Sequence, residues 1–377
     1  MASIDLTHTP YGDLAIVAMR GCEEIAKQVD YYLMQWRGTP EEKSFVINAS
    51  CPRFGTGEAK GVFKHSARGL DAYIICDCFN YSVTYNMYGK EVPMSPDDHF
   101  QDLKRIIAAM GGKARRVNVI MPMLYEGRQH RRTTRESMDC AMALQELMAM
   151  GVKNFITFDA HDPRVNNAIP LDGFDNVQAA YQMIKALLRS TPDIKLDPDR
   201  TMIVSPDEGG MGRCIYYSSV LGLDLGMFYK RRDYSTIVDG RNPIVAHEFL
   251  GKDVTGMDLI LVDDMISSGE SMLDIAAKLK EKGARRIFIF STFGLFVNGL
   301  EKFDEYYENG LIDKIFTTNL IYNTPELLSR EWYCNVNMSK YIALLVDTIN
   351  CDNSISKLLD PADKIHSVVA KHEGKTE

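Results

Sequence analysis

The sequence contains no apolar stretch long enough to cross a lipid bilayer. The longest one, residues 287–297, is much shorter than the roughly 20 residues that a membrane-spanning helix needs. The first residues, MASIDLTHTPYGDL, also lack the basic segment and apolar core of a secretory signal. We therefore expect a cytoplasmic protein that does not contact membranes.

Cysteine is present, but never in the paired spacing of a zinc site. The eight cysteines are scattered through 377 residues, which fits reduced thiols in the cytoplasm. Cys76 and Cys78 form a C-x-C within YIICDC. Because residues two apart on a strand share a face, both thiols could contact one ligand. The simpler interpretation, which we favour, is two small apolar residues in a buried strand.

An excess of basic residues is also missing. The chain carries 43 Lys and Arg against 51 Asp and Glu, a formal net charge of −8, whereas nucleic-acid-binding domains are usually basic. There is no Walker A loop, and the glycines of PRFGTGEAKG (52–61) do not have the spacing of a dinucleotide fingerprint. Phosphate binding by such a chain would depend on local groups of Arg, Lys and backbone amides.

What the chain does have is a regular alternation of short apolar runs with helical patterns. The strand candidates are residues 44–49, 73–78, 117–122, 154–159, 201–206, 258–264 and 286–292. The helix candidates are residues 98–110, 136–150, 175–188, 210–221 and 269–282. This alternation predicts an α/β fold with parallel sheets, whose ligands bind beyond the carboxyl ends of the strands.

The domain organisation rests on weaker signals. The length suggests two or three domains, and both halves contain strand–helix units, but they do not align well enough to be called a repeat. We expect an N-terminal domain over residues 1–170 and a C-terminal domain over residues 171–350. Residues 351–377 are polar and are expected to form a frayed tail.

The strongest local signal is LILVDDMISSGES, residues 259–271. An apolar strand ends in Asp263 and Asp264, and a Ser/Gly loop then leads into a helix. Backbone N–H groups and hydroxyls at a helix N-terminus are suited to phosphate, and paired carboxylates are suited to sugar hydroxyls or Mg²⁺. The alternative is structural: the carboxylates close the strand, and Ser267 or Ser268 caps the helix.

Three further segments carry weaker signals. IVSPDEGGMGR (203–213) places Asp207 and several glycines after a strand, either for close approach to an anion or for a tight turn. The cationic segments YKRRD (229–233) and EGRQHRRTTRES (126–137) could clamp polyphosphate or be solvated charged faces. His161 in FDAHD could be an acid/base group, a phosphate contact or a structural histidine.

The order of these segments resembles the ribose-phosphate diphosphokinase family (phosphoribosyl-diphosphate synthetases), from about residue 12 to about residue 347. The match is sharpest at VDDMISSGES, and it extends to IVSPDEGG, FYKRR, FDAHD, EGRQHRR and PRFGTGE. One such loop also marks phosphoribosyltransferases, whereas six together indicate the diphosphokinase. The resemblance implies two tandem phosphoribosyltransferase-like domains, each a mostly parallel sheet flanked by helices, and usually a homo-oligomer, a hexamer built from dimers.

The resemblance also implies a reaction, in which the diphosphoryl group of ATP moves to the anomeric hydroxyl of ribose 5-phosphate with the help of Mg²⁺. The implied catalytic groups are Lys230, Arg232 and His161. The implied ATP contacts are Phe54 and Glu58, from a neighbouring subunit, together with Arg128, Gln129 and His161. The implied metal contacts are His161 and Asp207. The implied ribose 5-phosphate contacts are Asp263, Asp264, Ser267, Ser268, Gly269, Glu270 and Ser271.

The chain departs from the family pattern at the phosphate loop. The family usually has Asp-Thr-Gly-Gly-Thr where this chain has Ser-Ser-Gly-Glu-Ser, residues 267–271. Glu270 therefore adds a negative charge beside the expected phosphate, and we expect its side chain to point into solvent. Two other functions stay open on the sequence: a non-catalytic regulatory homologue of the synthetase, and a phosphoribosyltransferase.

Overall fold

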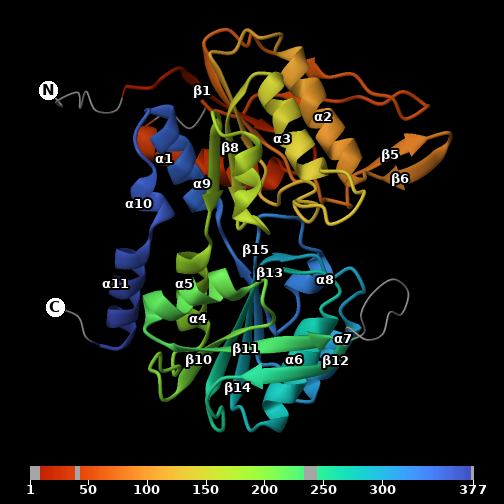
Figure 1. Ribbon diagram of the computed structural model, residues 1–377. Helices are drawn as coiled ribbons and strands as arrows, with labels where there is room; N and C mark the ends of the chain where they lie inside the picture. The colour runs from red at the N-terminus through yellow and green to blue at the C-terminus, as the bar shows by residue number, and fades with distance from the viewer. Residues whose placement is uncertain (1–8, 39–42, 233–243, 375–377) are drawn as a thin grey trace, which may run out of the picture. The chain divides into compact units, whose positions relative to one another are not determined.

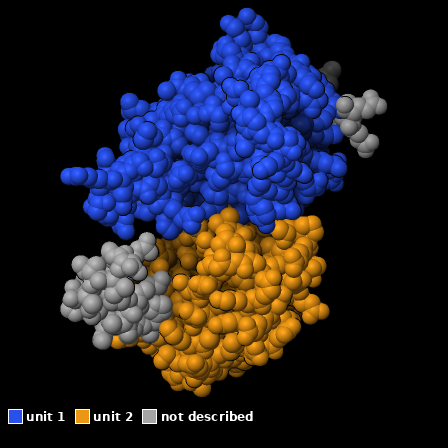
Figure 2. Space-filling model, turned by 90° about the vertical axis from the view of Figure 1, so that its right-hand side faces the viewer, with its two compact units in different colours: residues 1–178, 319–322, 337–360 blue, residues 179–318, 323–336, 361–377 orange. Residues whose placement is uncertain are grey.

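The computed structural model describes residues 9–38, 43–232 and 244–374, and for residues 230–232 and 244–247 it describes the backbone only. The chain forms two compact units (Figure 2). Unit 1 comprises residues 1–178, 319–322 and 337–360, and unit 2 comprises residues 179–318, 323–336 and 361–377. The chain therefore passes between the units several times. Within the described ranges, no helix is long and apolar enough to cross a membrane.

Unit 1 is built around a five-stranded parallel sheet with the strand order β1-β4-β7-β8-β9 (Figure 1). Its strands are β1 (Asp13–Ala18), β4 (Leu70–Ile75), β7 (Arg116–Ile120), β8 (Val152–Phe158) and β9 (Gly173–Val177). All six residues of β4 are buried, as expected for a parallel strand covered on both faces. Two short hairpins stand apart: β2 (Ala49–Ser50) with β3 (Val62–Phe63), and β5 (Thr84–Met87) with β6 (Lys90–Pro93).

Helices cover both faces of this sheet. One side carries α1 (Glu23–Arg37) and α9 (Ser339–Asn350), which pack on each other; the other carries α2 (Pro96–Ala109) and α3 (Asp139–Ala149) (Figure 1). Unit 1 also contains the 3-10 helix η2 (Pro163–Ala168) and the short α10 (Ser356–Leu359). A capping box between Ser95 and Asp98 begins α2 and satisfies backbone donors that its first turn leaves unpaired.

Unit 2 contains a seven-stranded sheet with the order β12-β11-β10-β13-β14-β15-β16. Its strands are β10 (Thr201–Ser205), β11 (Asp224–Arg232), β12 (Ile244–Leu250), β13 (Asp258–Ile266), β14 (Arg286–Gly294), β15 (Lys314–Thr318) and β16 (Tyr333–Val336). All neighbours are parallel except β11 and β12, which pair antiparallel at the sheet edge.

The helices of unit 2 form a layer on each side of the sheet. α4 (Ala180–Ser190), α5 (Met211–Leu221) and α11 (Ala362–His372) lie on one side; α6 (Glu270–Glu281) and α7 (Glu301–Glu308) lie on the other (Figure 1). The short α8 (Pro325–Leu328) precedes β16. Aromatic packing fills the α6–α7 side, where Phe303 stacks on Trp332 with ring centroids 5.7 Å apart.

Both sheets begin their central strands with the same kind of buried ion pair. In unit 1, Asp71 of β4 is in register with Arg116 of β7, whose Nη2 lies 2.7 Å from the carboxylate. In unit 2, Asp258 of β13 is in register with Arg286 of β14, again with 2.7 Å between Nη2 and the carboxylate. Both aspartates are completely buried. The two units thus share an internal likeness that is not apparent from sequence alignment by eye.

Some expectations from the sequence differ from the structure. The helix candidate 175–188 begins within β9, and α4 begins only at Ala180. Residues 44–49 are not a strand of the main sheet: Val46 makes only an isolated bridge to Ile16, and β2 begins at the end of the segment. Residues 351–377, expected to be a frayed tail, contain α10 and α11. Helix α11 is fixed by the fully buried Ile365, and Val368 and Val369 are half-buried at helical spacing from it.

Candidate functional site

The paired carboxylates lie at the carboxyl end of β13 in unit 2, as the sequence predicts. Asp263 and Asp264 belong to the strand, as predicted, and the strand continues two residues further than expected, to Ile266. Oδ1 of Asp263 accepts a hydrogen bond from the backbone N–H of Asp264 (2.9 Å) and lies 3.7 Å from Nη1 of Arg213. Burial and the neighbouring Asp264 hold the pKa of Asp263 well above its usual range.

The turn from β13 into α6 has the form expected of a phosphate cradle. Gly269 is the N-cap, with φ of 81°, and no side chain caps the helix, so the structural alternative in which Ser267 or Ser268 is the cap is wrong. In the described part of the chain, the hydroxyls of Ser267, Ser268 and Ser271 have no hydrogen-bond partner. Unpaired N–H groups and hydroxyls at a helix N-terminus can bind an oxyanion.

Only glycine fits at position 269. A Cβ there would lie 2.1 Å from Cζ of Phe303, and the left-handed backbone conformation is one that L side chains rarely adopt. The buried ring of Phe303 therefore packs against the backbone at Gly269 and holds the turn in this conformation. Although residues 267–271 differ from the family pattern, they keep Gly269, the glycine that this turn requires.

Glu270 does not project into the turn. Its side chain is 57% exposed, and its Oε1 lies 3.2 Å from Nζ of Lys302 on α7. This confirms the expectation that the carboxylate points to solvent. The negative charge that distinguishes this loop is thus partly offset by a neighbouring lysine.

Asp207 lies in the turn between β10 and α5. Its Oδ1 accepts hydrogen bonds from the backbone N–H groups of Gly209 (2.9 Å) and Gly210 (3.2 Å). The backbone carbonyl of Asp207 also accepts a bond from the Ser205 hydroxyl, at 2.7 Å. Part of the carboxylate is therefore engaged in holding the turn, so the tight-turn alternative describes at least one function of this residue.

Lys230 and Arg232 lie in the last residues of β11, opposite β12. No strand was predicted over the cationic segment 229–233, whereas the backbone of residues 229–232 continues the edge hairpin of unit 2, with a register irregularity between Arg231 and Arg232. Their side chains, and residues 233–243, lie outside the described residues. Antiparallel pairing of this kind aligns the backbone of a cationic segment on a rigid edge strand.

In unit 1, His161 follows the carboxyl end of β8 and is exposed. Its ring lies 5.4 Å from that of His130, which comes from the segment after β7. Nε2 of His130 lies 3.5 Å from Asp162, and Asp162 also accepts a bond from Nε of Arg164 at 2.9 Å. Hydrogen bonding from Arg164 lowers the pKa of Asp162 to about 2. Two imidazoles and a permanent carboxylate therefore lie together at this edge.

Arg128 and Gln129 follow β7 in the same unit. Arg128 is exposed, whereas Gln129 donates from Nε2 to the carbonyls of Ser137 (2.9 Å) and Arg131 (3.3 Å). These bonds tie both ends of the arginine-rich segment together. Gln129 is thus a structural residue of this loop in addition to being a candidate ATP contact.

Phe54 and Glu58 lie in the turn between β2 and β3. The backbone N–H of Phe54 donates to the carbonyl of Glu58 at 2.7 Å, and the Phe54 ring is 55% exposed. Arg53, stacked over Tyr85 and bonded to Asp102 (2.9 Å), fixes the base of the turn. An exposed aromatic on a fixed turn is available to a ligand or to another protein chain.

Two neighbours of these residues were missed by sequence reasoning. His130 is 13% exposed, and its buried Nδ1 has no hydrogen-bond partner among the described residues. Arg213 lies on α5, close to Asp263. Neither carries a local sequence signal: His130 stands in a run of charges, and the position of Arg213 depends on how two strand–helix units pack.

The cysteines and metal ligands give simpler outcomes. Sγ of Cys76 and Sγ of Cys78 lie 3.7 Å apart, and both residues are completely buried, in line with the apolar interpretation, but they follow the end of β4 at Ile75 and are not part of the strand. Among the described residues, no three His, Cys, Asp or Glu side chains are grouped to hold a metal ion. Mg²⁺ commonly binds through one or two carboxylates plus substrate phosphates, and Asp207 provides such an oxygen donor. The imidazole of His161 suits Mg²⁺ only as an indirect contact.

Comparison with known proteins gives a consistent result. Residues 14–151 match the model of the N-terminal domain of ribose phosphate pyrophosphokinase, and residues 235–360 match that of the phosphoribosyl synthetase-associated domain. A ribose-phosphate pyrophosphokinase of Vibrio cholerae is 25% identical over 83% of this chain and 91% of its own length. One from Haemophilus ducreyi is 26% identical over 92% of this chain and 99% of its own length.

The fold is also known from a solved structure. The phosphoribosylpyrophosphate synthetase of Mycobacterium smegmatis superimposes with a TM-score of 0.72, covering 89% of this chain and 98% of that one, at 20% identity. At this identity the likeness shows the fold. It supports the expected architecture of two α/β units with mostly parallel sheets.

Proposed function

Because the chain belongs to the ribose-phosphate pyrophosphokinase family, we propose that it transfers the diphosphoryl group of ATP to the anomeric hydroxyl of ribose 5-phosphate. The products are 5-phosphoribosyl 1-diphosphate and AMP. The observation that carries the proposal is the end of β13, where paired carboxylates are followed by a helix N-terminus with no side-chain cap. That arrangement suits a phosphorylated sugar with free hydroxyls.

In this reaction Asp263 and Asp264 bind the ribose hydroxyls. Ser267, Ser268, Gly269, Glu270 and Ser271 surround the 5-phosphate, with Glu270 contributing its backbone N–H and keeping its carboxylate at Lys302. The raised pKa of Asp263 favours a shared proton in the pair. A neutral carboxyl donates a hydrogen bond to a hydroxyl oxygen, while the ionised one accepts from another hydroxyl.

The residues proposed for ATP are Phe54, Glu58, Arg128, Gln129 and His161, all from unit 1. We propose Lys230 and Arg232 as the cations that stabilise the transferred group, because phosphoryl chemistry depends on positioning and charge and needs no covalent intermediate. Mg²⁺ would neutralise the phosphate oxygens, with His161 and Asp207 as its candidate protein contacts. The division into an ATP side (1–170) and a ribose 5-phosphate side (171–350) is part of the same proposal.

We also propose that the enzyme works in the cytoplasm as a homo-oligomer, a hexamer built from dimers. The exposed Phe54 ring on its fixed turn supports this proposal. In such an assembly the Phe54–Glu58 turn of one subunit would complete the adenine pocket of another. Light scattering tests the assembly, and a fully active monomer would contradict a shared site.

A release assay for AMP tests the function. Wild-type protein with ATP, ribose 5-phosphate and Mg²⁺ should release AMP, and omission of the sugar phosphate should abolish the release. Lys230→Ala should slow turnover by about 100-fold or more. Lys252→Ala is the matched control, because Lys252 follows the same hairpin but pairs with Asp224 (2.6 Å). Equal activity of the two variants would remove Lys230 from the mechanism.

The same assay separates the two alternatives. A regulatory homologue would release no AMP by itself but would change the rate of an active synthetase mixed with it. A phosphoribosyltransferase would consume 5-phosphoribosyl 1-diphosphate and release diphosphate in the presence of a base. The near-complete coverage of the curated relatives favours the synthetase.

A further inference from the structure

Unit 2 also has a hollow that none of the proposed site residues lines. It is a groove of about 680 Å³ between α4 and α11. Its lining residues are Tyr181, Lys185, Leu188, Arg189, Asp363, Lys364, Ser367, Val368, Lys371 and His372. A volume of this size is typical of sites for small molecules. All of these residues belong to unit 2.

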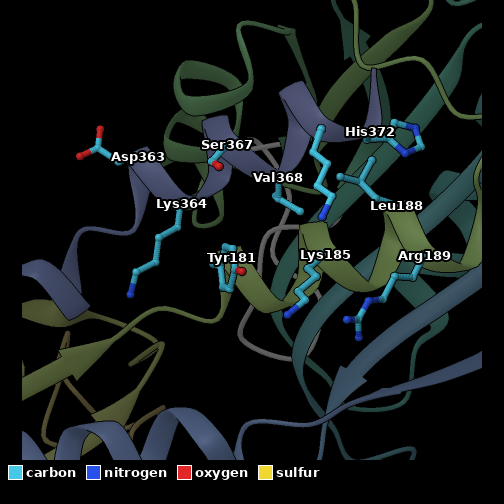
Figure 3. A pocket seen from close by; sticks show the side chains of 10 residues that line it. Tyr181, Lys185, Leu188, Arg189, Asp363, Lys364, Ser367, Val368 and His372 are labelled. Carbon is cyan, nitrogen blue, oxygen red and sulfur yellow. The ribbon is translucent and has the colours of Figure 1, made fainter. Parts of the chain in front are cut away.

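The groove is cationic in an acidic protein. Lys185 and Arg189 come from α4, Lys364 and Lys371 come from α11, and Asp363 is the only acid in the lining, whereas the whole chain has a net charge of −8. Figure 3 shows the charged ends of Lys185, Arg189 and Lys364 directed to the same side, with Asp363 pointing away from them. Within the described chain, Arg189, Lys364 and Lys371 form no ion pair. Such a concentration of cations selects anions.

The spacing of the cations indicates more than one phosphate. Lys185 and Arg189 are one turn apart on α4, and Lys364 and Lys371 are two turns apart on the same face of α11, a separation of about 10 Å. That length exceeds a single phosphate and fits a chain of several phosphoryl groups. The ring of Tyr181, which lies 5.6 Å below Nζ of Lys185, adds an aromatic surface at one side.

The groove has fixed walls. Nε2 of His372 lies 3.1 Å from the carbonyl of Ile194, and Nε2 of His366 lies 3.0 Å from that of Val220. Together with the buried Ile365, these contacts hold α11 against α4 and α5. The apolar anchor of α11 is thus used inside unit 2, which argues against a helix that inserts its apolar face into a lipid surface.

We propose that the groove between α4 and α11 is a binding site for a small molecule with two or more linked phosphoryl groups. The site is separate from the proposed catalytic residues, since none of them lines it. Half of its wall is α11, which begins just after residue 360, where the match to the synthetase-associated domain ends. The ligand is a nucleoside polyphosphate if Tyr181 stacks on a base, and an inorganic polyphosphate if only the cations contribute.

Hydrogen–deuterium exchange of the full chain tests this proposal, because it reports on each helix separately. Tripolyphosphate is titrated in one series and ADP in another. We expect both series to slow exchange in residues 180–190 and 362–372 in a saturable way. If the half-saturating concentration is lower for ADP, the ligand is a nucleotide. If it is lower for tripolyphosphate, the ligand is an inorganic polyphosphate.

Charge reversal supplies the decisive variant. Lys364→Glu with Lys371→Glu should raise the half-saturating concentration of both probes about tenfold or more, while AMP release in the catalytic assay stays unchanged. Lys357→Glu is the matched control, because Lys357 is exposed on α10 and does not line the groove. The proposal is overturned if the double variant behaves like the wild type, or if neither probe slows exchange. Slowing only by phosphatidylserine vesicles, or only by a poly-glutamate peptide, would overturn it as well.

Discussion

The two units are alike at one edge of their sheets and different at the other. At the amino-terminal edge, each buries an in-register Asp–Arg pair, Asp71 with Arg116 and Asp258 with Arg286. At the carboxyl-terminal edge, unit 2 has a left-handed glycine that leads directly into α6, whereas unit 1 has the His130, His161 and Asp162 group followed by a 3-10 helix. The shared edge supports the sheet, and the divergent edge carries the proposed site residues.

Two buried aspartates show how the surroundings decide the state of a carboxyl group. Burial alone would raise the pKa of Asp258, but hydrogen bonds from Arg285 and Arg286 outweigh it and lower the pKa. Among the described residues, the hydrogen bonds to Asp77, just beyond β4, come from the backbone N–H groups of Phe79 and Tyr322, and burial raises its pKa to about 6. The first aspartate is ionised at neutral pH for structural reasons, whereas the second titrates in the physiological range.

The largest effect is expected at the carboxyl-terminal edge of unit 2. Asp263→Asn with Asp264→Asn should lower kcat/KM for ribose 5-phosphate by about 1,000-fold, because the hydroxyl contacts made in the transition state are lost. Stability at pH 7 should stay the same or rise, since the raised pKa of Asp263 means that its ionised form opposes folding. AMP release and thermal unfolding measure the two quantities. A large loss of stability with normal activity would mean that the pair is structural.

The opposite result is expected at the amino-terminal edge. Asp258→Ala leaves Arg285 and Arg286 without their buried counter-charge and should lower the free energy of unfolding by about 3–5 kcal/mol. Asp71→Ala should do the same in unit 1. Activity per folded molecule should be retained, as chemical denaturation and active-site titration would show.

Asp193→Ala is the matched control for this edge. It removes the other partner of Arg286, a carboxylate whose side chain is 69% exposed, and should cost less than about 1 kcal/mol. If this exposed pair proved as important as the buried one, burial would not be the reason for the stability of the shared edge.

A pH effect should distinguish the two kinds of buried aspartate. The pKa of Asp77 is raised from 3.8 to about 6, so the folded state binds the proton more tightly and loses stability as pH rises through this range. The loss approaches about 3 kcal/mol. Relative to wild type, Asp77→Asn should therefore gain stability between pH 4 and pH 7 in urea unfolding. A constant difference across this range would mean that Asp77 has its ordinary pKa.

The smallest effect is expected for Glu270, the residue that sets this phosphate loop apart from the family pattern. Because its carboxylate is exposed and paired with Lys302, Glu270→Gln should change KM for ribose 5-phosphate by less than about threefold. Initial rates at varied sugar phosphate measure it. A tenfold decrease in KM would show that the charge opposes the ligand.

The sequence predicts much of the central sheets. β13 and β14 are continuous apolar runs, and helices such as α6 have clear periodicity, so their existence follows from local pattern. No strand was predicted over β11, because its last residues (229–232) are polar and cationic and lie beyond the part of the strand that pairs with β10. α11 was missed because its few apolar residues, Ile365, Val368 and Val369, stand in a segment that is polar on either side of them.

The candidate site was predictable where it follows from topology. Asp263 lies near the carboxyl end of β13, and Asp207 and His161 follow the ends of β10 and β8, so their position at a carboxyl edge follows from the fold class. The contacts of Arg213 with Asp263 and of His130 with Asp162 join segments far apart in the chain. Strand register sets the Asp71–Arg116 and Asp258–Arg286 pairs, and no local pattern encodes register between strands.

The path of the chain also affects how the protein is made. Asn350, near the end of α9, donates a hydrogen bond to the carbonyl of Gly12 (3.1 Å) and another to Asp71 (2.8 Å). Helix α9 also packs on α1. While the ribosome is still translating unit 2, α9 has not yet been synthesised, so one helical layer on the sheet of unit 1 is incomplete. Unit 1 can complete its folding only when residue 350 has left the exit tunnel. Most of unit 2 must therefore be synthesised before α1 can pack on α9 and before Asp71 can bond to Asn350.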